Sequence, residues 1–448
     1  MDTKVIIIGA GMAGLSAGKM LSTHNIPFEI LEARNRTGGR IYTQYDKEVG
    51  ILELGGQWIG PTQDEMYKLL EEYKLEVFPT YTEGKNLIAF NNKISQYSGL
   101  IPKVSIPVLL NIDFVIKDIN RKADFIDVHQ PWLHPKANQW DSITLYQYLQ
   151  KKVWLSTALG ILQAGLETVF GVHPSEISLL QVLFYIKSGK DLNVLFNIEG
   201  GAQQHRIKEG MGAVVDGMAK LISSRIHLNQ AVRSVLKSGE VYRVISDNET
   251  FTCQRIILAI PPALWSSIQF EPDLPSLKFQ GMQRMPMGTV IKCYAIYKEP
   301  FWRHEGLSGI AVTDPTYPFQ TVFDNTEPGA QGGKLMAFSI ANRARALQSF
   351  DPEKRKETII KHLAALFGEQ ANFPTHYVEQ CWSTERWSRG CYAGMKIPGA
   401  WTAFKDVLSQ KVGGIHFAGT ETSPIWNGYI EGAILSGKRA ALEVVNSL

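Results

Sequence analysis

The sequence has 448 residues, of which 44% are hydrophobic and 20% are charged, and its formal net charge is +3. This composition excludes a disordered chain and predicts a large buried core, built as two or three domains or as one composite unit. So small a net charge, with no run of basic residues, indicates neither a nucleic-acid partner nor an acidic membrane surface.

Cysteine and histidine usage gives no sign of a structural metal or of disulfide bonds. The cysteines Cys253, Cys293, Cys381 and Cys391 show no CxxC spacing, and the histidines form no ligand pattern beside them. We therefore expect no metal site and a reducing compartment, the cytoplasm. The apolar run near the N-terminus is too short for a signal peptide, and no stretch approaches the length that spans a bilayer, so we expect a soluble protein without a transmembrane anchor.

The first motif is "KVIIIGAGMAGLSAGKML", which predicts a buried strand at Val5–Ile8, then a tight turn and a helix. Gly9, Gly11 and Gly14 have the GxGxxG spacing of a dinucleotide-binding turn. In such a turn the first glycine permits the bend, the second lets a pyrophosphate approach the backbone, and the third lets helix and strand pack closely. The helix N-terminus then offers free N–H groups to the phosphates.

A second strand, "FEILEA", follows and reaches Glu32. An acidic residue at this distance from the glycine turn binds a ribose hydroxyl in dinucleotide-binding folds. Strand, helix and Glu32 together favour a nucleotide site over an unrelated glycine turn, and they leave FAD and NAD both open as the ligand.

Two glycine pairs come next, Gly38-Gly39 in "EARNRTGGR" and Gly55-Gly56 in "LELGGQWIGPTQ". Closely spaced glycine pairs predict a backbone that lies against something flat or charged, and ordinary turns are the alternative interpretation.

The composition changes from about residue 77, where proline and aromatic residues increase and helical stretches such as 156–169 occur, which predicts an inserted domain. The apolar segment 105–116 is expected to be a helix that covers a substrate cavity rather than a membrane patch. The segments "IHLNQAVRSVLKSG" and "FTCQRIILAIPPALW" are typical of short strands, and the C-terminal "GGIHFAGTETSPIWNGYIEGAILSGKRAALEVV" predicts a strand, a glycine turn and a closing helix. We therefore predict two interleaved domains.

Four motifs together make the chain resemble the monoamine oxidases, a family of flavin-containing amine oxidases, over nearly its whole length. They are "GAGMAGLSAGKML" with "LEARNRTGGR", "MPMGTVIKCYAIYKEPFW", "WSTERWSRGCYAG" and "FAGTETSPIWNGYIEGA". The resemblance implies an α/β fold in which a Rossmann-like FAD-binding domain is interleaved with an α+β substrate-binding domain, the amine oxidase fold. We expect the FAD-binding domain to comprise residues 1–76, 205–270 and 382–448, and the substrate-binding domain residues 77–204 and 271–381. We expect no counterpart of the C-terminal membrane helix of the animal enzymes.

FAD is the cofactor that the resemblance implies, and it also implies which residues hold it. The expected cofactor-binding residues are Gly9, Gly11, Gly14, Glu32, Arg34, Gly38, Gly39, Arg40, Gly55, Gly56, Gln57, Trp58, Val232, Trp382, Cys391, Gly419, Glu421, Gly428, Tyr429 and Ile430.

Three residues are expected to be catalytic by the same resemblance: Lys292, Tyr392 and Tyr429. Lys292 matches the family's lysine that holds a water at flavin N5. A lysine within an apolar strand is costly unless it is satisfied, and the alternative is a strand-edge position from which its ammonium reaches solvent. The two tyrosines match a pair whose rings flank the amine nitrogen.

The substrate cavity is expected to be bounded by further residues of the matched segments. Gln203 matches the substrate-side glutamine of the family, and the other expected lining residues are Trp58, Phe196, Met336 and Phe338.

Cys391 matches the family's cysteine that is bonded to the flavin 8α carbon, and as in the family a cage tyrosine follows it. A thiolate is a good nucleophile for that electrophilic carbon, which favours covalent attachment. Arg389 departs from the glycine of the animal enzymes; it either changes the approach of the loop or, as a nearby cation, lowers the pKa of the thiol. The alternative is a small buried thiol that touches the ring.

The resemblance implies FAD-dependent oxidative deamination of hydrophobic primary amines, of arylalkylamine type, to aldehyde, ammonia and hydrogen peroxide with oxygen. A polyamine or diamine (putrescine-type) oxidase stays open because Glu199 lies near Gln203. An L-amino-acid oxidase needs a carboxylate-binding arginine, and none occurs at the matched cage positions. A demethylase would carry partner-binding insertions, and a non-catalytic FAD-binding protein would not need the lysine and both tyrosines. The expected partners are a small amine and oxygen, with no nucleic acid, and a homodimer is left open.

Overall fold

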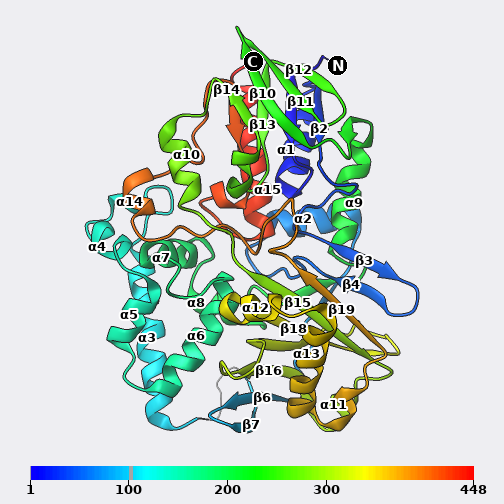
Figure 1. Cartoon of the computed structure of the whole chain (residues 1–448), viewed down its shortest axis with the longest axis vertical. Coiled ribbons are helices and arrows are strands. Elements are labelled where there is room, and N and C mark those ends of the chain that lie inside the picture. The colour runs from blue at the N-terminus through cyan, green and yellow to red at the C-terminus, as the bar shows by residue number, and fades with distance from the viewer. Residues whose placement is uncertain (1, 100–103) are drawn as a thin grey trace.

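The structure is a computed structural model that describes residues 2–99 and 104–448. The described residues form three larger sheets, two two-stranded ribbons and a set of helices. Figure 1 shows the nucleotide-type sheet and the two ends of the chain at the top, the largest sheet at the bottom right, and the helices α3 to α8 at the lower left.

A five-stranded parallel sheet forms the centre of the upper part, in the order β20-β13-β1-β2-β9. Its strands are β1 (Val5–Ile8), β2 (Phe28–Leu31), β9 (Ile226–His227), β13 (Arg255–Leu258) and β20 (Ile415–Phe417). Every residue of β1 is buried, as expected for a strand that is covered on both faces. The helices α1 (Met12–Thr23) and α15 (Ile430–Val445) pack together beside it. The predicted strand–turn–helix at the N-terminus and the closing C-terminal helix are confirmed.

A four-stranded sheet lies beside it, in the order β12-β11-β10-β14. Its strands are β10 (Val232–Ser238), β11 (Val241–Ser246), β12 (Thr250–Cys253) and β14 (Gln269–Glu271). The two predicted strand segments of this region are therefore confirmed.

A seven-stranded sheet dominates the lower part, in the order β19-β15-β18-β17-β16-β6-β7. Its strands are β6 (Lys85–Phe90), β7 (Lys93–Tyr97), β15 (Val290–Tyr297), β16 (Leu307–Thr313), β17 (Thr321–Asp324), β18 (Gly333–Ile340) and β19 (His376–Cys381). All residues of β15 and β18 are buried because both strands lie in the interior of the sheet. Two small ribbons complete the strands: β3 (Thr43–Asp46) with β4 (Gly50–Glu53), and β5 (Val77–Pro79) with β8 (His205–Ile207).

The helices of the inserted segment form their own apolar core on one side of the large sheet. They are α3 (Ile106–Asp124), α4 (Ala137–Asp141), α5 (Leu145–Lys152), α6 (Ser156–Phe170), α7 (Leu179–Ser188) and α8 (Leu192–Phe196). The remaining helices are α2 (Asp64–Tyr73), α9 (Met211–Leu221), α10 (Ser276–Gln283), α11 (Phe301–His304), α12 (Ala341–Gln348), α13 (Pro352–Phe367) and α14 (Ala400–Phe404), with short 3-10 turns between some of them. The helices expected over residues 105–116 and 156–169 are confirmed as parts of α3 and α6.

The sheets draw their strands from separate parts of the chain. The five- and four-stranded sheets take their strands from residues 5–31, 226–271 and 415–417, and the seven-stranded sheet from 85–97 and 290–381. The domain boundaries themselves stay a prediction. Within the residues that the structure describes, no helix is long and apolar enough to cross a membrane.

Candidate active site

A cavity of about 1190 Å³ runs through the molecule from the carboxyl ends of β1 and β2 to the helices α3, α6 and α8. One end is lined by the glycine turn after β1 and the other by apolar and aromatic side chains. The two ends belong to one continuous cavity. Lys292, Cys391 and the expected tyrosines line its middle part.

The glycine turn has two kinds of glycine, and the space around each tells them apart. A Cβ at Gly14 would lie 1.9 Å from the carbonyl oxygen of Gly9, so Gly14 is required by the contact of helix and turn. A Cβ at Gly11 would have no protein atom nearer than 3.9 Å, the Cα of Gly39. The space over Gly11 is therefore open toward the cavity, as a backbone that receives a pyrophosphate needs.

Two of the helices that begin at this cavity, α1 and α15, have no side-chain cap and lie toward its nucleotide end and its middle. The N-cap of α1 is Gly11 and the N-cap of α15 is Tyr429. Met12 and Ala13 of α1, and Ile430 and Ala433 of α15, line the cavity. Their uncapped N–H groups and the positive ends of the helix dipoles are suited to a ligand that carries phosphates and ring oxygens.

Glu32 is buried at the end of β2 and lines the cavity beside the turn. Its carboxylate accepts hydrogen bonds from the backbone N–H groups of Ala10 (2.8 Å) and Arg34 (2.9 Å), which fix its position. The Arg34 side chain donates to the Ser388 hydroxyl (2.8 Å), and its buried Nε has no protein partner among the described residues. A carboxylate and an unclaimed N–H donor thus face the same space.

Arg40, which is partly exposed and lines the cavity, forms an ion pair with the buried Glu421. The guanidinium donates to both carboxylate oxygens, at 2.6 and 3.1 Å, and to the backbone oxygen of Tyr392 at 2.8 Å. Burial alone would raise the pKa of Glu421, but Arg40 holds that pKa below its ordinary value. The pair therefore stays charged and fixes the loop that carries Cys391 and Tyr392.

Most residues expected to bind the cofactor line this one cavity. They are Gly9, Gly11, Glu32, Arg34, Gly38, Gly39, Arg40, Gly55, Gly56, Gln57, Trp58, Val232, Trp382, Cys391, Gly419, Gly428, Tyr429 and Ile430. Gly14 and Glu421 are not among the lining residues: Gly14 serves the packing of α1, and Glu421 acts through Arg40.

Lys292 lies on β15 in the interior of the large sheet and is only 2% exposed. Its ammonium donates to the backbone oxygen of Gly55 (3.0 Å) and to Gln57 Oε1 (2.6 Å). The alternative of a strand-edge lysine that reaches solvent is wrong, because β15 pairs with β18 on one side and β19 on the other. Burial lowers the pKa of Lys292 to about 7, against the opposing charge of Glu53.

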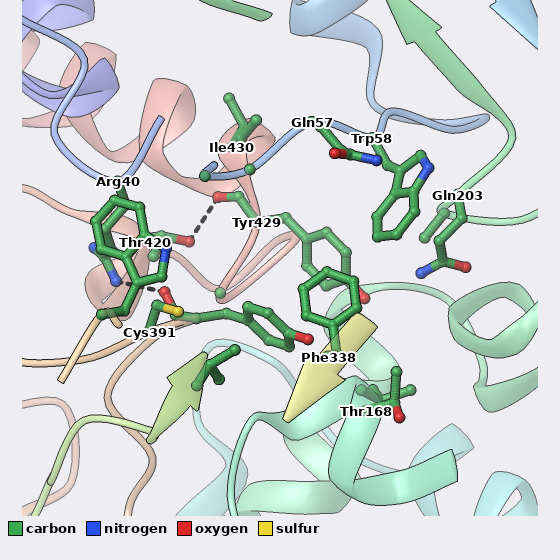
Figure 2. A pocket seen from close by; sticks show the side chains of 18 of the residues that line it. Arg40, Gln57, Trp58, Thr168, Gln203, Phe338, Cys391, Thr420, Tyr429 and Ile430 are labelled. Atoms are coloured by element: carbon green, nitrogen blue, oxygen red, sulfur yellow. Dashed lines mark hydrogen bonds between the residues drawn. The ribbon is translucent and has the colours of Figure 1, made fainter. Parts of the chain in front are cut away.

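Aromatic side chains surround the part of the cavity beyond Lys292. Figure 2 shows Arg40, Thr420 and Cys391 at one side, and Trp58, Phe338 and Gln203 at the other, with Tyr429 between them. Phe338 is the strand neighbour of Lys292 on β18, and its ring contacts Tyr392 at 6.1 Å and Trp58 at 5.9 Å between centroids. The expected cage residues Tyr392 and Tyr429 both line the cavity.

Three of the four further residues expected around the substrate line the cavity: Phe196, Gln203 and Phe338. Met336 does not. It lies two residues before Phe338 on the same face of β18, opposite Tyr294, where it is fully buried in the core behind the cavity. Every second side chain of a strand lies on the same face of the sheet. The sequence pattern therefore could not show whether Met336 or Phe338 borders the cavity.

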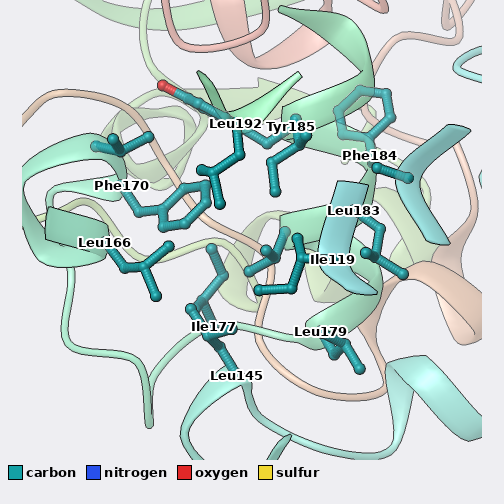
Figure 3. Packing of buried hydrophobic residues seen from close by; sticks show 14 of the residues in the cluster. Ile119, Leu145, Leu166, Phe170, Ile177, Leu179, Leu183, Phe184, Tyr185 and Leu192 are labelled. Atoms are coloured by element: carbon teal, nitrogen blue, oxygen red, sulfur yellow. The ribbon is translucent and has the colours of Figure 1, made fainter. Parts of the chain in front are cut away.

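The far wall of the cavity belongs to the helical core. Figure 3 shows Leu166 and Phe170 of α6 packed with Leu179, Leu183 and Tyr185 of α7. Tyr185 also lines the cavity and contacts the Tyr429 ring at 5.8 Å. The apolar residues of α6 and α7 therefore form a firm backing for one cage tyrosine.

Two carboxylates lie on the side of the cavity formed by the helices of the inserted segment. Among the described lining residues outside the nucleotide end, the carboxylates are Asp113 on α3 and Glu199 after α8. Both are exposed, and Asp113 pairs with Lys117 at 2.8 Å. The described residues contain no group of His, Cys, Asp and Glu that could hold a metal ion.

Cys391 is buried in the middle of the cavity and its thiol is free. Burial raises the pKa of the thiol, and the charges of Arg40 and Lys292 oppose this. Arg389 is exposed, so the nearby cations that act on the thiol are Arg40 and Lys292 rather than the arginine expected from the sequence.

Several lining residues were not expected, among them Tyr185, Thr168 and Phe323. Phe323 lies on the short strand β17, whose two apolar residues Val322 and Phe323 are adjacent, so no alternation in the sequence marks it. The other two lie on helices whose apolar pattern predicts burial but not which core residue borders a cavity.

The comparisons with known proteins agree with this geometry. The model of the family described as flavin containing amine oxidoreductase matches residues 12–445. The chain belongs to this family. Flavin-containing amine oxidase A of Equus caballus is 35% identical over 448 residues, which cover 99% of this chain and 85% of the relative. Amine oxidase B of Sus scrofa is 33% identical over 449 residues, which cover 99% and 86%.

Solved structures with the same fold include two amine oxidases. Putrescine oxidase, solved in its wild-type form bound to putrescine, has a TM-score of 0.94 and 31% identity, covering all of this chain and 99% of that chain. Cyclohexylamine oxidase from Brevibacterium oxydans has a TM-score of 0.95 and 27% identity, with the same coverage. The protein is thus a flavin amine oxidase with the amine oxidase fold, and FAD is its cofactor. The open space over Gly11 and the unclaimed Arg34 Nε fit that cofactor.

Proposed function

We propose that this amine oxidase acts on hydrophobic primary amines of arylalkylamine type and forms an aldehyde, ammonia and hydrogen peroxide with oxygen. The observation that carries the proposal is the apolar space bounded by Tyr392, Tyr429, Phe338 and Trp58 next to the buried Lys292. Aromatic faces accept a neutral amine and a flat ring without the cost of a fixed charge.

The bound FAD supplies the two-electron acceptor for the carbon beside the amine nitrogen, and oxygen regenerates it. We propose that the glycine turn, Glu32 and Arg34 hold its nucleotide half, and that the N-terminus of α15 and the residues around Gly56 hold its ring half. The roles of these residues rest on their positions along the cavity.

The side chains of the amine end orient the substrate and exclude water. Tyr392 is held by Arg40 through its backbone oxygen, and Tyr429 is held by contacts with Tyr185 and Trp426. Two of the three N–H groups of Lys292 are taken by Gly55 and Gln57, which leaves the third to hold a water in the cavity that Lys292 lines.

Amino acids fit this cavity less well than simple amines do. The two arginines among the described lining residues are Arg34 and Arg40, and both lie at the cofactor end. Arg40 already pairs with Glu421, and Arg34 lies beside Glu32, where we propose that the nucleotide half of FAD is held. Neither is therefore available for the bidentate pairing that a substrate carboxylate needs.

A diamine is the second candidate substrate, for two reasons. Asp113 and Glu199, which line the cavity, could face a distal ammonium, and one similar structure is a putrescine oxidase. Both carboxylates are exposed, however, so they would contribute only the small energy of a surface ion pair.

A substrate screen tests the proposal. Peroxide release would be measured with phenethylamine, cyclohexylamine, putrescine and L-phenylalanine, with catalase as the control for peroxide. We expect phenethylamine to have the highest kcat/KM. The fastest turnover with putrescine would favour the diamine oxidase, and the fastest turnover with the amino acid would contradict the cavity argument.

We further propose that FAD is attached covalently through Cys391 Sγ at the 8α carbon. The thiol lies in the middle of the cavity, where the ring half of the flavin would lie. Burial raises the pKa of this thiol, and the charges of Arg40 and Lys292 act against that rise. The net change replaces one methyl hydrogen and the thiol hydrogen by a C–S bond, and oxygen takes up the two hydrogens as peroxide.

Acid precipitation tests this attachment. The yellow colour should stay with the pellet of the wild-type protein and move to the supernatant for Cys391→Ala. Cys381→Ala is the matched control, because Cys381 is also a free cysteine near this region but does not line the cavity. Free release of the wild-type flavin would show that Cys391 only packs against the ring.

Three further expectations stay proposals: the two-domain division, a cytoplasmic location and a homodimer. Light scattering on the purified protein would test the last of these.

A further inference from the structure

A chain of buried polar side chains is hydrogen-bonded to the Lys292 ammonium. A lysine that only held a water would not need such a chain. We infer that Gln57, Asn325 and Tyr294 are positioning residues, which fix the Lys292 ammonium and sustain its positive charge through a one-directional chain of hydrogen bonds. The inference rests on the proposed function, in which Lys292 works at the flavin.

The chain runs through four hydrogen bonds of ordinary length. Lys292 Nζ donates to Gln57 Oε1 (2.6 Å), and Gln57 Nε2 donates to Asn325 Oδ1 (2.7 Å). Asn325 Nδ2 donates to the Tyr294 hydroxyl (2.8 Å), which donates to the backbone oxygen of Glu53 (2.9 Å) and has a longer contact with Gln57 Oε1 (3.3 Å). Gln57, Asn325 and Tyr294 each accept one bond and donate the next, so the chain leads from the ammonium to a carbonyl.

The direction of the chain is determined by its first member. An ammonium can only donate, so Gln57 must turn its oxygen toward Lys292 and its amide nitrogen toward Asn325. Asn325 must then accept with its oxygen and donate with its nitrogen, which makes Tyr294 the acceptor of that bond. The dipoles therefore all present their negative ends toward Lys292, and such chains strengthen one another.

The members come from different parts of the fold and are buried. Gln57 (2% exposed) follows β4, Asn325 (1%) follows β17, and Tyr294 (0%) lies on β15 two residues from Lys292, on the same face. Buried amides are costly unless every polar atom is satisfied, and here they satisfy one another and the lysine. A chain of this kind holds its members in one arrangement, so it fixes where the remaining N–H group of Lys292 points.

The hydrogen-bond acceptors of Lys292 matter because the protonated and neutral forms of this lysine are close in free energy near neutral pH. Burial lowers the pKa of Lys292 to about 7, so small changes in its acceptors change its charge near neutral pH. The titratable and charged groups that face it from neighbouring elements are Glu53, Arg206, Cys391 and Tyr294. Glu53 favours the charged form and Arg206 opposes it, while the rings of Trp58 and Phe338 lie 6.0 and 5.6 Å from the ammonium.

The test measures the titration of Lys292 directly, in addition to activity. The FAD-loaded protein would be labelled with carbon-13 at lysine Cε, and the Lys292 signal would be assigned by its absence from Lys292→Met. Gln57→Leu removes the acceptor, and Tyr294→Phe removes the end of the chain. We expect at least Gln57→Leu to lower the proton affinity of Lys292 by about tenfold, and Gln57→Glu to raise it, because it places a negative acceptor at the same point.

Tyr297→Phe is the matched control. Tyr297 lies on the same strand and is also buried, and its hydroxyl also donates to a backbone oxygen, that of Ala371 at 3.0 Å. It belongs to the core on the opposite face of the sheet, away from Lys292. We expect Tyr297→Phe to lose a similar amount of stability as Tyr294→Phe while the Lys292 titration stays unchanged.

The second measurement is the pH dependence of the rate at which oxygen reoxidises the flavin. In each variant its midpoint should move in the same direction as the Lys292 titration, downward for Gln57→Leu and Tyr294→Phe and upward for Gln57→Glu. An unchanged titration in both loss variants, or an equal change in Tyr297→Phe, would overturn the inference. If Gln57→Leu does not fold, Tyr294→Phe decides the question alone. If no amine reduces the flavin, the proposed function fails, while the titration still tests the chain.

Discussion

The nucleotide end of the cavity is lined mainly by backbone groups, and the amine end is lined mainly by side chains. The nucleotide end is largely backbone: Gly11 leaves open space, the uncapped N-terminus of α1 supplies N–H groups, and the side chains of Glu32 and Arg34 lie beside it. The amine end is a surface of side chains from the large sheet and the helical core, such as Phe338, Tyr429 and Phe196. The glycine turn, Glu32 and Arg34 of the nucleotide end lie close together in the sequence. The amine end forms only when segments that are distant in the sequence pack against one another.

This difference separates the two kinds of function. The phosphates of a dinucleotide are held through backbone groups that every residue has, so substitutions in the glycine turn should act by steric exclusion. The amine is selected through side chains, so substitutions there should change turnover and leave the cofactor in place.

The largest effect should come from Gly14→Ala, because its Cβ would lie 1.9 Å from the Gly9 oxygen. We expect loss of bound flavin together with a lower melting temperature of the flavin-free protein. Gly11→Ala is the matched control: its Cβ meets no protein atom nearer than 3.9 Å, so it should bind FAD more weakly with little change in that melting temperature. Equal destabilisation by both variants would contradict the distinction between packing and cofactor space.

Lys292→Met should have the next largest effect. It removes a positive charge and a donor from the middle of the cavity while keeping a similar volume. We expect flavin reoxidation by oxygen to slow by about 10²-fold, and reduction by substrate to slow less, because the charge acts where oxygen is reduced. Stopped-flow measurement of the two half-reactions tests this, and equal slowing of both would assign Lys292 a structural role.

Tyr392→Leu and Tyr429→Leu should act at the amine end alone. Loss of one aromatic face should lower kcat/KM by about tenfold, with FAD still bound. The measurement is steady-state kinetics together with the flavin content of each variant. Loss of the flavin would mean that the tyrosines belong to the cofactor site, and the two ends would not be separable.

The smallest predicted effect concerns Lys278, a buried lysine outside the cavity whose ammonium donates to the Leu408 oxygen at 3.1 Å. Burial lowers its pKa from 10.5 to about 7. Between about pH 7 and pH 10 the unfolded chain therefore binds more protons than the folded one, so this lysine makes stability rise with pH in that window. Lys278→Met should flatten the rise of the melting temperature with pH, with no effect on the pH profile of reoxidation. A change in the pH profile of reoxidation would contradict the claim that only a lysine in the cavity, Lys292, acts on that step.

The two ends also differ in how well they could be predicted from the sequence. The glycine turn, β1, β2 and Glu32 follow one another in the chain, so spacing alone indicated their arrangement. Lys292 stood out because it interrupts an apolar strand. Met336 was placed in the cavity wrongly, because β18 has two apolar residues on one face and only the meeting of strands and helices decides which of them borders the space.

The polar chain behind Lys292 shows the same limit. Tyr294 could have been found from its place two residues along the strand, but nothing in the segment around Asn325 indicates that its amide meets Gln57. Such contacts depend on the pairing of distant segments, which leaves no periodic pattern in the sequence.

The most direct test of the account is anaerobic mixing of the purified enzyme with phenethylamine in a stopped-flow spectrophotometer. We expect the oxidised flavin absorbance to disappear faster than with putrescine or L-phenylalanine at the same concentration, and to return when oxygen is added. An enzyme whose flavin is reduced by putrescine or the amino acid but stays oxidised with phenethylamine would contradict the claim that the aromatic end of the cavity selects hydrophobic amines.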